Sequence, residues 1–231
     1  MMRKIITIYI ILLTISLLSP ALPVMAQKSP QTDTKEEEKI PLYNGTSIGV
    51  DVFGIGNKLF GGDFLSSEVS IDVNLKNRFF PVVEIGYGTT DATEDTYNIH
   101  YKSSAPYARI GLNYNTMAKK KSDSFLYAGI RYGFSKFKYD VQAPPLYDPI
   151  WKGEVPFGYD GVKSSAHWIE LLVGIKVKII KNFQMGWTLR YKARLSAKES
   201  LNTTPWYIPG YGSNKSGNFG ATYNLIYKLP F

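Results

Sequence analysis

The sequence predicts an all-β fold: an eight-stranded antiparallel transmembrane β-barrel with short periplasmic turns and long external loops. Three observations predict it, namely an N-terminal export signal, apolar residues that alternate with polar ones, and connections that alternate between short and long. The mean hydropathy of −0.15 excludes a helical membrane bundle. The chain contains no cysteine, so disulfides and thiolate metal sites are excluded as well.

The start of the chain has the layout of a signal peptide. Arg3 and Lys4 precede an apolar run over residues 5–18, and the segment that ends at Ala26 has the small-residue spacing of a cleavage site. The apolar run is shorter than the roughly 20 residues that a membrane-spanning helix needs. We therefore expect residues 1–26 to be removed during export.

The next segment, residues 27–43, is polar and lacks apolar periodicity, which predicts a disordered periplasmic leader. The barrel is expected to cover residues 44–231. The formal net charge is +8, but the chain has no basic cluster beyond Lys119, Lys120 and Lys121, so nucleic acid is not an expected partner. Outer-membrane lipid and lipopolysaccharide, which carry anionic headgroups, are the expected partners instead.

Apolar residues recur at every second position from residue 46 onward. In the first predicted strand, Ile48, Val50 and Val52 alternate with small or polar residues. The same alternation predicts further strands around residues 68–75, 79–87, 108–114, 126–134, 169–179, 185–195 and 223–231. The predicted connections are short at residues 76–78, 116–123 and 180–182, and long at residues 54–67, 88–104, 140–165 and 196–217. This strict alternation places both ends of the barrel on the periplasmic side.

A soluble sandwich or a lipocalin-like barrel would show alternating strands too. In a soluble barrel the apolar side chains would point inward. About thirty large apolar side chains would overfill an eight-stranded interior, which ordinary side chains just fill. We therefore expect the apolar face to meet lipid and the polar face to line the interior.

The polar face carries acids on the early strands and bases mainly on the later ones. Closing the barrel brings the two sets together across the interior, where charges removed from water need partners. The predicted lumenal ion-pair network consists of Asp51, Asp72, Glu84, Arg109, Arg131, Glu170, Lys176, Arg190 and Arg194. A narrow basic solute pore is the alternative interpretation of the same residues.

Aromatic residues fall into two groups. The first is expected at the depth of the lipid headgroups, and it consists of Tyr87, Tyr107, Tyr114, Tyr132, Trp168, Trp187, Tyr191, Tyr223 and Tyr227. The second lies in two proline-containing external loops, and it consists of Tyr147, Trp151, Phe157, Tyr159, Trp206, Tyr207 and Tyr211. The loop rings are expected either to pack together as a lid or to bind an external ligand or protein.

The last nine residues, YNLIYKLPF, place Tyr223, Leu225, Tyr227, Leu229 and Phe231 on one face of the final strand. A terminal aromatic after alternating apolar residues looks like the signal by which the barrel assembly machinery recognises outer-membrane barrels. Together with the signal peptide and the strand rhythm, this ending resembles small eight-stranded outer-membrane barrels. More specifically, the chain resembles an uncharacterised family of such proteins from the Bacteroidota, a domain of unknown function. The resemblance covers roughly residues 44–231 and implies a place in the bacterial outer membrane, but no known activity.

The sequence contains few residues and motifs that are typical of catalytic sites. The chain has two histidines, His100 and His167, and no zinc-protease, P-loop or nucleophile-elbow motif. Ser165 and His167 share the outward face at a strand rim, and Asp160 is a loop acid that could orient the histidine. Some outer-membrane lipid A deacylases of this barrel size use His and Ser facing the outer leaflet, so a lipid A-modifying hydrolase is the alternative function. No cofactor and no metal site is expected.

These patterns together predict a monomeric, closed outer-membrane barrel with a structural or loop-mediated binding role. A hydrolase would need Ser165 and His167 within hydrogen-bond reach of each other, near an acid. A pore would need a continuous wet interior. A binding protein would need neither.

Overall fold

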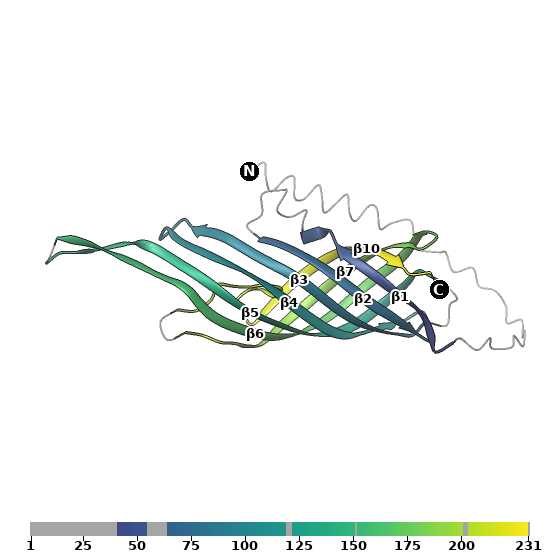
Figure 1. Ribbon diagram of the computed structural model, residues 1–231. Helices are drawn as coiled ribbons and strands as arrows, with labels where there is room; N and C mark the ends of the chain where they lie inside the picture. Colours follow the sequence, from purple (N-terminus) through teal and green to yellow (C-terminus); the bar gives the residue numbers. More distant parts are fainter. Residues whose placement is uncertain (1–40, 55–63, 119–121, 151, 201–202, 231) are drawn as a thin grey trace, which may run out of the picture. The chain divides into compact units, whose positions relative to one another are not determined.

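The structure is a computed structural model that describes residues 41–54, 64–118, 122–150, 152–200 and 203–230. The expected signal peptide lies outside the described residues, as do most of the expected leader, Trp151 and Phe231. The strands are β1 (Tyr43–Asp51), β2 (Phe64–Leu75), β3 (Phe79–Glu94), β4 (Ile99–Asn115), β5 (Phe125–Asp148), β6 (Gly153–Ile180), β7 (Phe183–Ala197), β8 (Tyr207–Ile208), β9 (Gly212–Ser213) and β10 (Gly217–Lys228) (Figure 1). In this part of the chain, no helix is long and apolar enough to cross a membrane.

Eight of the strands form one sheet that closes on itself. Their order around the ring is β1-β10-β7-β6-β5-β4-β3-β2, and neighbouring strands are antiparallel. The pairing of β1 with β10 closes the ring and runs from Ser47 opposite Lys228 to Asp51 opposite Asn224. The predicted all-β class, with eight antiparallel strands in a hydrogen-bonded ring, is confirmed.

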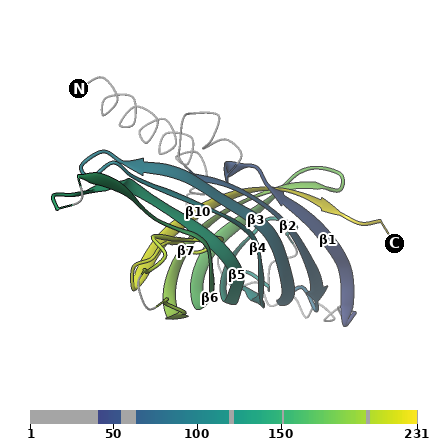
Figure 2. The same ribbon diagram turned by 60° about the vertical axis from the view of Figure 1, so that its left-hand side comes forward.

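Two of the hairpins are longer than the sequence predicts. The prediction of long loops at residues 88–104 and 140–165 is wrong, because strand pairing continues through both segments as far as Glu94 opposite Ile99 and Asp148 opposite Gly153. The two prolines at residues 144–145, which indicate a loop, lie where the β5–β6 register shifts and a ladder hydrogen bond is not needed. The paired ends of β5 and β6 therefore form a ribbon that extends beyond the neighbouring strands (Figures 1 and 2).

The outer face of the ring carries exposed aliphatic side chains on all eight strands. The register places them side by side: Val50 lies opposite Leu225 on one side and Val69 on the other, and Val69 lies opposite Ile85. The exposed fractions of these four residues range from 38% to 61%. We call the whole set the outer belt: Ile48, Val50, Val69, Ile71, Val83, Ile85, Ile110, Leu112, Leu126, Ile130, Leu171, Val173, Ile175, Leu189 and Leu225.

Three layers of side chains fill the interior. Near the short turns lies a small apolar cluster of Phe80, Phe125, Tyr127 and Leu172. Charged residues occupy the middle of the ring. Toward the long hairpins lies a larger aromatic cluster, which includes Tyr101, Tyr107, Phe137, Tyr139 and Trp168.

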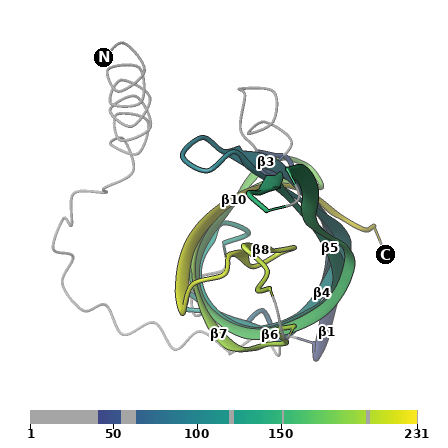
Figure 3. The same cartoon turned by 90° about the vertical axis from the view of Figure 1, so that its left-hand side faces the viewer.

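The connection between β7 and β10 folds into the ring instead of standing outside it. Figure 3 shows β8, which belongs to this connection, inside the circle of strands. We call residues 203–216 the inner loop. Its Ile208 is fully buried, and the Tyr101 hydroxyl of β4 donates a hydrogen bond of 2.9 Å to the Tyr207 carbonyl oxygen. The expected external loop is therefore part of the interior core.

Candidate functional site

A network of buried ion pairs occupies the middle of the interior. The Arg109 guanidinium contacts the carboxylates of Glu68, Glu84 and Glu170, with Nε 2.8 Å from Glu170 Oε1. Arg190 Nη1 lies 2.8 Å from Glu84 Oε2 and 3.2 Å from Glu170 Oε2. The two arginines, on β4 and β7, therefore tie together acids that come from β2, β3 and β6.

Two further ion pairs extend this network. Arg131 Nε lies 3.0 Å from Glu84 Oε1 in the middle of the ring. Lys176 Nζ lies 2.9 Å from Asp72 Oδ2, and its ammonium group also faces the Phe80 ring at 5.4 Å. The second pair lies close to the apolar cluster near the short turns, so charge reaches that end of the interior as well.

Two residues of the predicted network have other partners. Asp51 Oδ1 accepts hydrogen bonds from the backbone N–H groups of Phe53, at 3.0 Å, and Tyr223, at 3.1 Å. Arg194 donates to the side-chain oxygen of Asn214 in the inner loop. Asp51 thus holds the end of β1 against β10, and Arg194 holds the inner loop.

Two charged residues of the interior are missing from the predicted network. Glu68 pairs with Arg109 and accepts a 3.0 Å hydrogen bond from the Tyr107 hydroxyl. Lys192 Nζ donates a 2.8 Å hydrogen bond to the Gly210 carbonyl oxygen of the inner loop. Strand parity could have found both, because Glu68 shares the inner face with Asp72 and Lys192 shares it with Arg190.

The aromatic girdle is only partly where the sequence predicts it. Tyr87, Tyr114, Tyr132, Trp187, Tyr191 and Tyr227 are exposed on the outer face. The prediction is wrong for Tyr107 and Trp168, which are buried in the interior. Each of these two rings lies over a glycine of the adjacent strand, Gly86 for Tyr107 and Gly133 for Trp168, where a Cβ atom would collide with the ring. Because these glycines have no side chain, the narrow interior of the closed sheet has room for the two large aromatic side chains.

The rings of the two predicted loops separate into different environments. Tyr207 and Tyr211 are buried with the inner loop. Trp206 stacks on Tyr101 with ring centroids 5.5 Å apart. Tyr147 and Phe157 are instead exposed on the β5–β6 ribbon. Tyr159, in the same ribbon, is half-buried and packs edge-on against Phe157.

In the structure, His167 of the hydrolase alternative has partners other than Ser165 and Asp160. His167 Nδ1 lies 2.7 Å from the Tyr132 hydroxyl, and its ring packs against Phe134 at 5.0 Å between centroids. In the part of the chain that the structure describes, no hydrogen bond joins Ser165 to His167, and Asp160 is exposed on the ribbon. No group of three or more potential metal-binding residues occurs among the described residues either.

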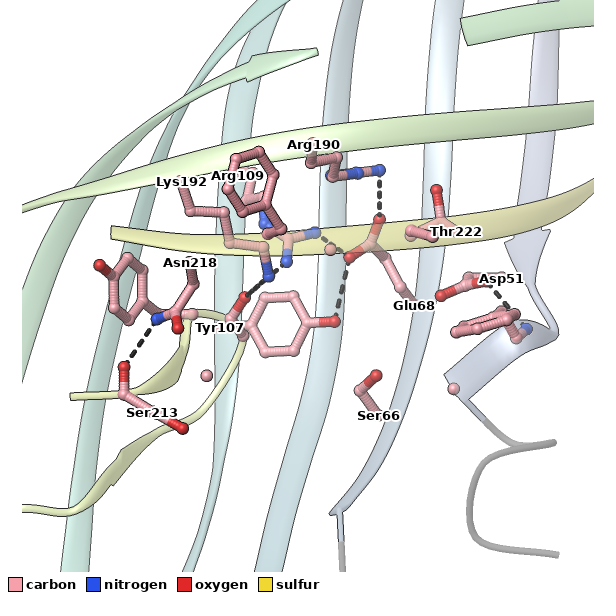
Figure 4. Close-up of a pocket in the computed structure, with 18 of the residues that line it drawn as sticks. Asp51, Ser66, Glu68, Tyr107, Arg109, Arg190, Lys192, Ser213, Asn218 and Thr222 are labelled. Carbon is pink, nitrogen blue, oxygen red and sulfur yellow. Dashed lines mark hydrogen bonds and ion pairs between the residues drawn. The ribbon is translucent and has the colours of Figure 1, made fainter. Parts of the chain in front are cut away.

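A pocket of about 280 Å³ opens beside the inner loop (Figure 4). The charged side chains in its lining are those of Asp51, Glu68, Arg109, Arg190 and Lys192, and Tyr107 lines it as well. Its other walls are the end of β1, the inner loop and the first half of β10. The pocket therefore joins the charged middle layer to the rim of the ring, and its wall carries both charged groups and backbone carbonyls.

The ring and its charged interior define the class of protein: an all-β protein whose eight antiparallel strands close into a hydrogen-bonded ring around buried ion pairs. The chain belongs to the family described as "Domain of unknown function (DUF6048)", whose family model matches residues 1–231. No curated protein matches the chain.

Proposed function

We propose that this protein is a monomeric β-barrel of the bacterial outer membrane, closed to solutes, with a structural or loop-mediated binding role. The observation that carries the proposal is the outer belt, which is exposed on every strand while charged residues are buried inside. In water, an apolar surface of this extent would lead to association or aggregation. A bilayer covers such a belt, because the outward-facing residues of a transmembrane barrel are apolar.

The flanking aromatics support the same orientation. Phe79 packs on Tyr114 and Phe183 packs on Tyr227, with centroid distances of 5.6 and 5.1 Å, and all four rings lie close to the short turns. Rings at the edge of an apolar band are typical of the headgroup region of a membrane. The short turns are assigned to the periplasmic side, because the periplasmic turns of outer-membrane barrels are the short ones.

Closure to solutes is supported by what fills the interior. The ion pairs of Arg109 and Arg190 cross the ring, and the inner loop lies between them and the long-hairpin end. An eight-stranded ring has room for little more than its own side chains. A solute would have to displace both the inner loop and the ion pairs.

The binding role is assigned to the β5–β6 ribbon. Leu146, Tyr147, Val155 and Phe157 are exposed there, on a part of the fold that needs none of them for the interior core. Exposed rings held on paired strands are a rigid surface for an external ligand or protein. Tyr223, Leu225 and Tyr227 lie at alternate positions of β10 and share its outer face. We assign these residues to recognition by the barrel assembly machinery.

Membrane embedding can be tested with two tryptophans that face opposite sides of the wall. Single-tryptophan variants would retain either Trp187, exposed on the outer face, or Trp168, buried in the interior, with the other tryptophans changed to Phe. After folding into vesicles that contain dibrominated phosphatidylcholine, Trp187 fluorescence should be strongly quenched and Trp168 fluorescence much less.

Equal, weak quenching of both tryptophans would contradict the lipid-facing orientation of the outer belt. A full chain that stays soluble and monodisperse without detergent would contradict the membrane location itself. Trp168 is the matched control for Trp187, because the two tryptophans lie on the neighbouring strands β6 and β7 of the same ring.

A further inference from the structure

In the part of the interior that the structure describes, Lys192 lacks the carboxylate partner that four other cations have. Arg109, Arg131, Lys176 and Arg190 each lie within 4.0 Å of a carboxylate oxygen. Among the described residues, Lys192 Nζ has no carboxylate at that distance, and its hydrogen bond goes to the Gly210 carbonyl oxygen. An ammonium group has three N–H donors, so one carbonyl does not satisfy it.

Lys192 lines the pocket beside the inner loop, as Figure 4 shows. Gly220 of β10 lies beside this side chain: a Cβ atom at this glycine would lie 3.3 Å from Lys192 Cε, a tight contact. The Gly210 carbonyl also accepts a 2.8 Å hydrogen bond from Arg109 Nη2. The inner loop therefore keeps a second anchor at this point when Lys192 engages something else.

Among the described residues, the strand pairing beside the pocket is one-sided. β1 pairs with β10 only as far as Asp51 opposite Asn224, whereas β10 pairs with β7 up to Gly217. In the described ranges, residues 217–222 of β10 thus have a strand partner on one side, and several of them line the pocket. Phe219, 87% exposed, stands on the outer face of the same segment. A polar group in the pocket could consequently belong to a molecule whose apolar part lies along the outer face of β10.

We propose that this pocket binds an oxyanion, a phosphate or carboxylate group, with Lys192 as its counter-ion. A half-buried cation that lacks a carboxylate partner is stabilised by an anionic ligand, and charge-assisted hydrogen bonds are the stronger kind. The volume of about 280 Å³ accommodates a headgroup or a small metabolite. The anion could come from a free solute or from a lipid headgroup. A free solute needs no membrane around the ring, so this site goes beyond the function proposed above.

The experiment is calorimetric titration of the full chain, folded in a nonionic detergent, with three probes. sn-Glycerol 3-phosphate and glycerate present the two anions without a tail, and dihexanoylphosphatidic acid presents a phosphate with short acyl chains. At least one probe should bind, and Lys192→Met should weaken that binding tenfold or more. Gly220→Val, which keeps the lysine and fills the space beside it, should weaken binding as well.

Lys163→Met is the matched control, because it removes the same charge from an exposed position on β6 that does not line the pocket, and it should leave the affinity unchanged. Circular dichroism and heat-modifiable migration in gel electrophoresis would establish that all variants are folded. Binding of a tail-free probe would assign the site to a free anion, and binding of dihexanoylphosphatidic acid alone would assign it to a lipid headgroup. Failure of all three probes to bind, or equal affinity of Lys192→Met and wild type, would overturn the proposal.

Discussion

At the scale of single residues, neighbours in sequence experience opposite environments. Leu189 is 65% exposed on the outer face, and Arg190, the next residue, is 3% exposed among three carboxylates. Successive side chains of a strand point to opposite faces of the sheet. Adjacent residues can therefore face the proposed lipid environment and the interior ion pairs, respectively. The two residues therefore form a natural pair for testing which face is which.

Both Arg190→Leu and Leu189→Arg should destabilise the protein folded in vesicles. Arg190→Leu leaves Glu68, Glu84 and Glu170 short of a buried partner, and we expect a loss of about 3–5 kcal/mol in the free energy of unfolding. Leu189→Arg places a charge against hydrocarbon and should cost about 2–4 kcal/mol near the middle of the bilayer. Urea unfolding followed by fluorescence would measure both.

Lys163→Leu, at an exposed position on β6, is the control for both changes and should alter the unfolding free energy by less than about 0.5 kcal/mol. If Leu189→Arg were as stable as wild type, the outer belt would not face lipid. If Arg190→Leu were neutral, the ion-pair network would contribute little to stability.

At the scale of elements, the β5–β6 ribbon is a separate extension of the ring. Its base is marked by a register shift at Asp140, whose carboxylate accepts a 2.6 Å hydrogen bond from the Gly161 N–H group. Gly161 has a φ of 62°, in the left-handed region that glycine adopts readily. Beyond this bulge the ribbon contributes little to the interior clusters. The stability of the ring should therefore depend little on the ribbon.

Removing the ribbon should therefore leave the ring intact. A variant that lacks residues 142–158 and joins Val141 to Tyr159, which lie opposite each other, through an Asn-Gly turn should fold in vesicles. Its unfolding free energy should stay within about 1 kcal/mol of wild type, since few buried contacts are lost. A failure to fold, or loss of the heat-modifiable form, would show that the ribbon is needed for the ring. Any binding to cell-surface partners should be lost with it.

At the scale of the whole molecule, the interior is closed twice. The ion pairs close the middle layer, and the inner loop with its aromatic cluster closes the long-hairpin end. The two closures come from different parts of the chain, because the ion pairs use the strands and the inner loop lies between β7 and β10. Loss of the inner loop should leave the ion pairs in place.

Ion conductance in planar bilayers tests this double closure. Wild-type protein should show no discrete conductance steps, and a variant in which a Gly-Ser linker replaces residues 204–215 should stay closed as well, because the ion pairs remain. Steps in the wild type would restore the narrow pore as the function. Steps in the linker variant alone would show that the inner loop is the real barrier and that the ion pairs pass solutes.

The strand pattern and much of the charged interior could be predicted from sequence, because alternation is a local property. Residues two positions apart share a face, so Glu84, Arg109 and Arg190 could be assigned to the interior one strand at a time. The same rule extends to Glu68, Tyr107 and Trp168, which share the parity of the inner face in their strands. Which acid meets which base is not local, since it depends on the register and closure of the ring.

The sequence by itself therefore determined the fold class and the division into an apolar and a charged face. Only the tertiary structure decided where the segments between the strands go. The inner loop enters the ring because Tyr101, on β4, supplies a hydrogen bond to Tyr207, and because Arg109 and Lys192 both donate to the Gly210 carbonyl. These partners lie up to about a hundred residues apart, so neither composition nor periodicity reveals the contact. The residues that line the pocket come together only through that contact and through closure of the ring. The sequence pattern therefore does not predict the pocket.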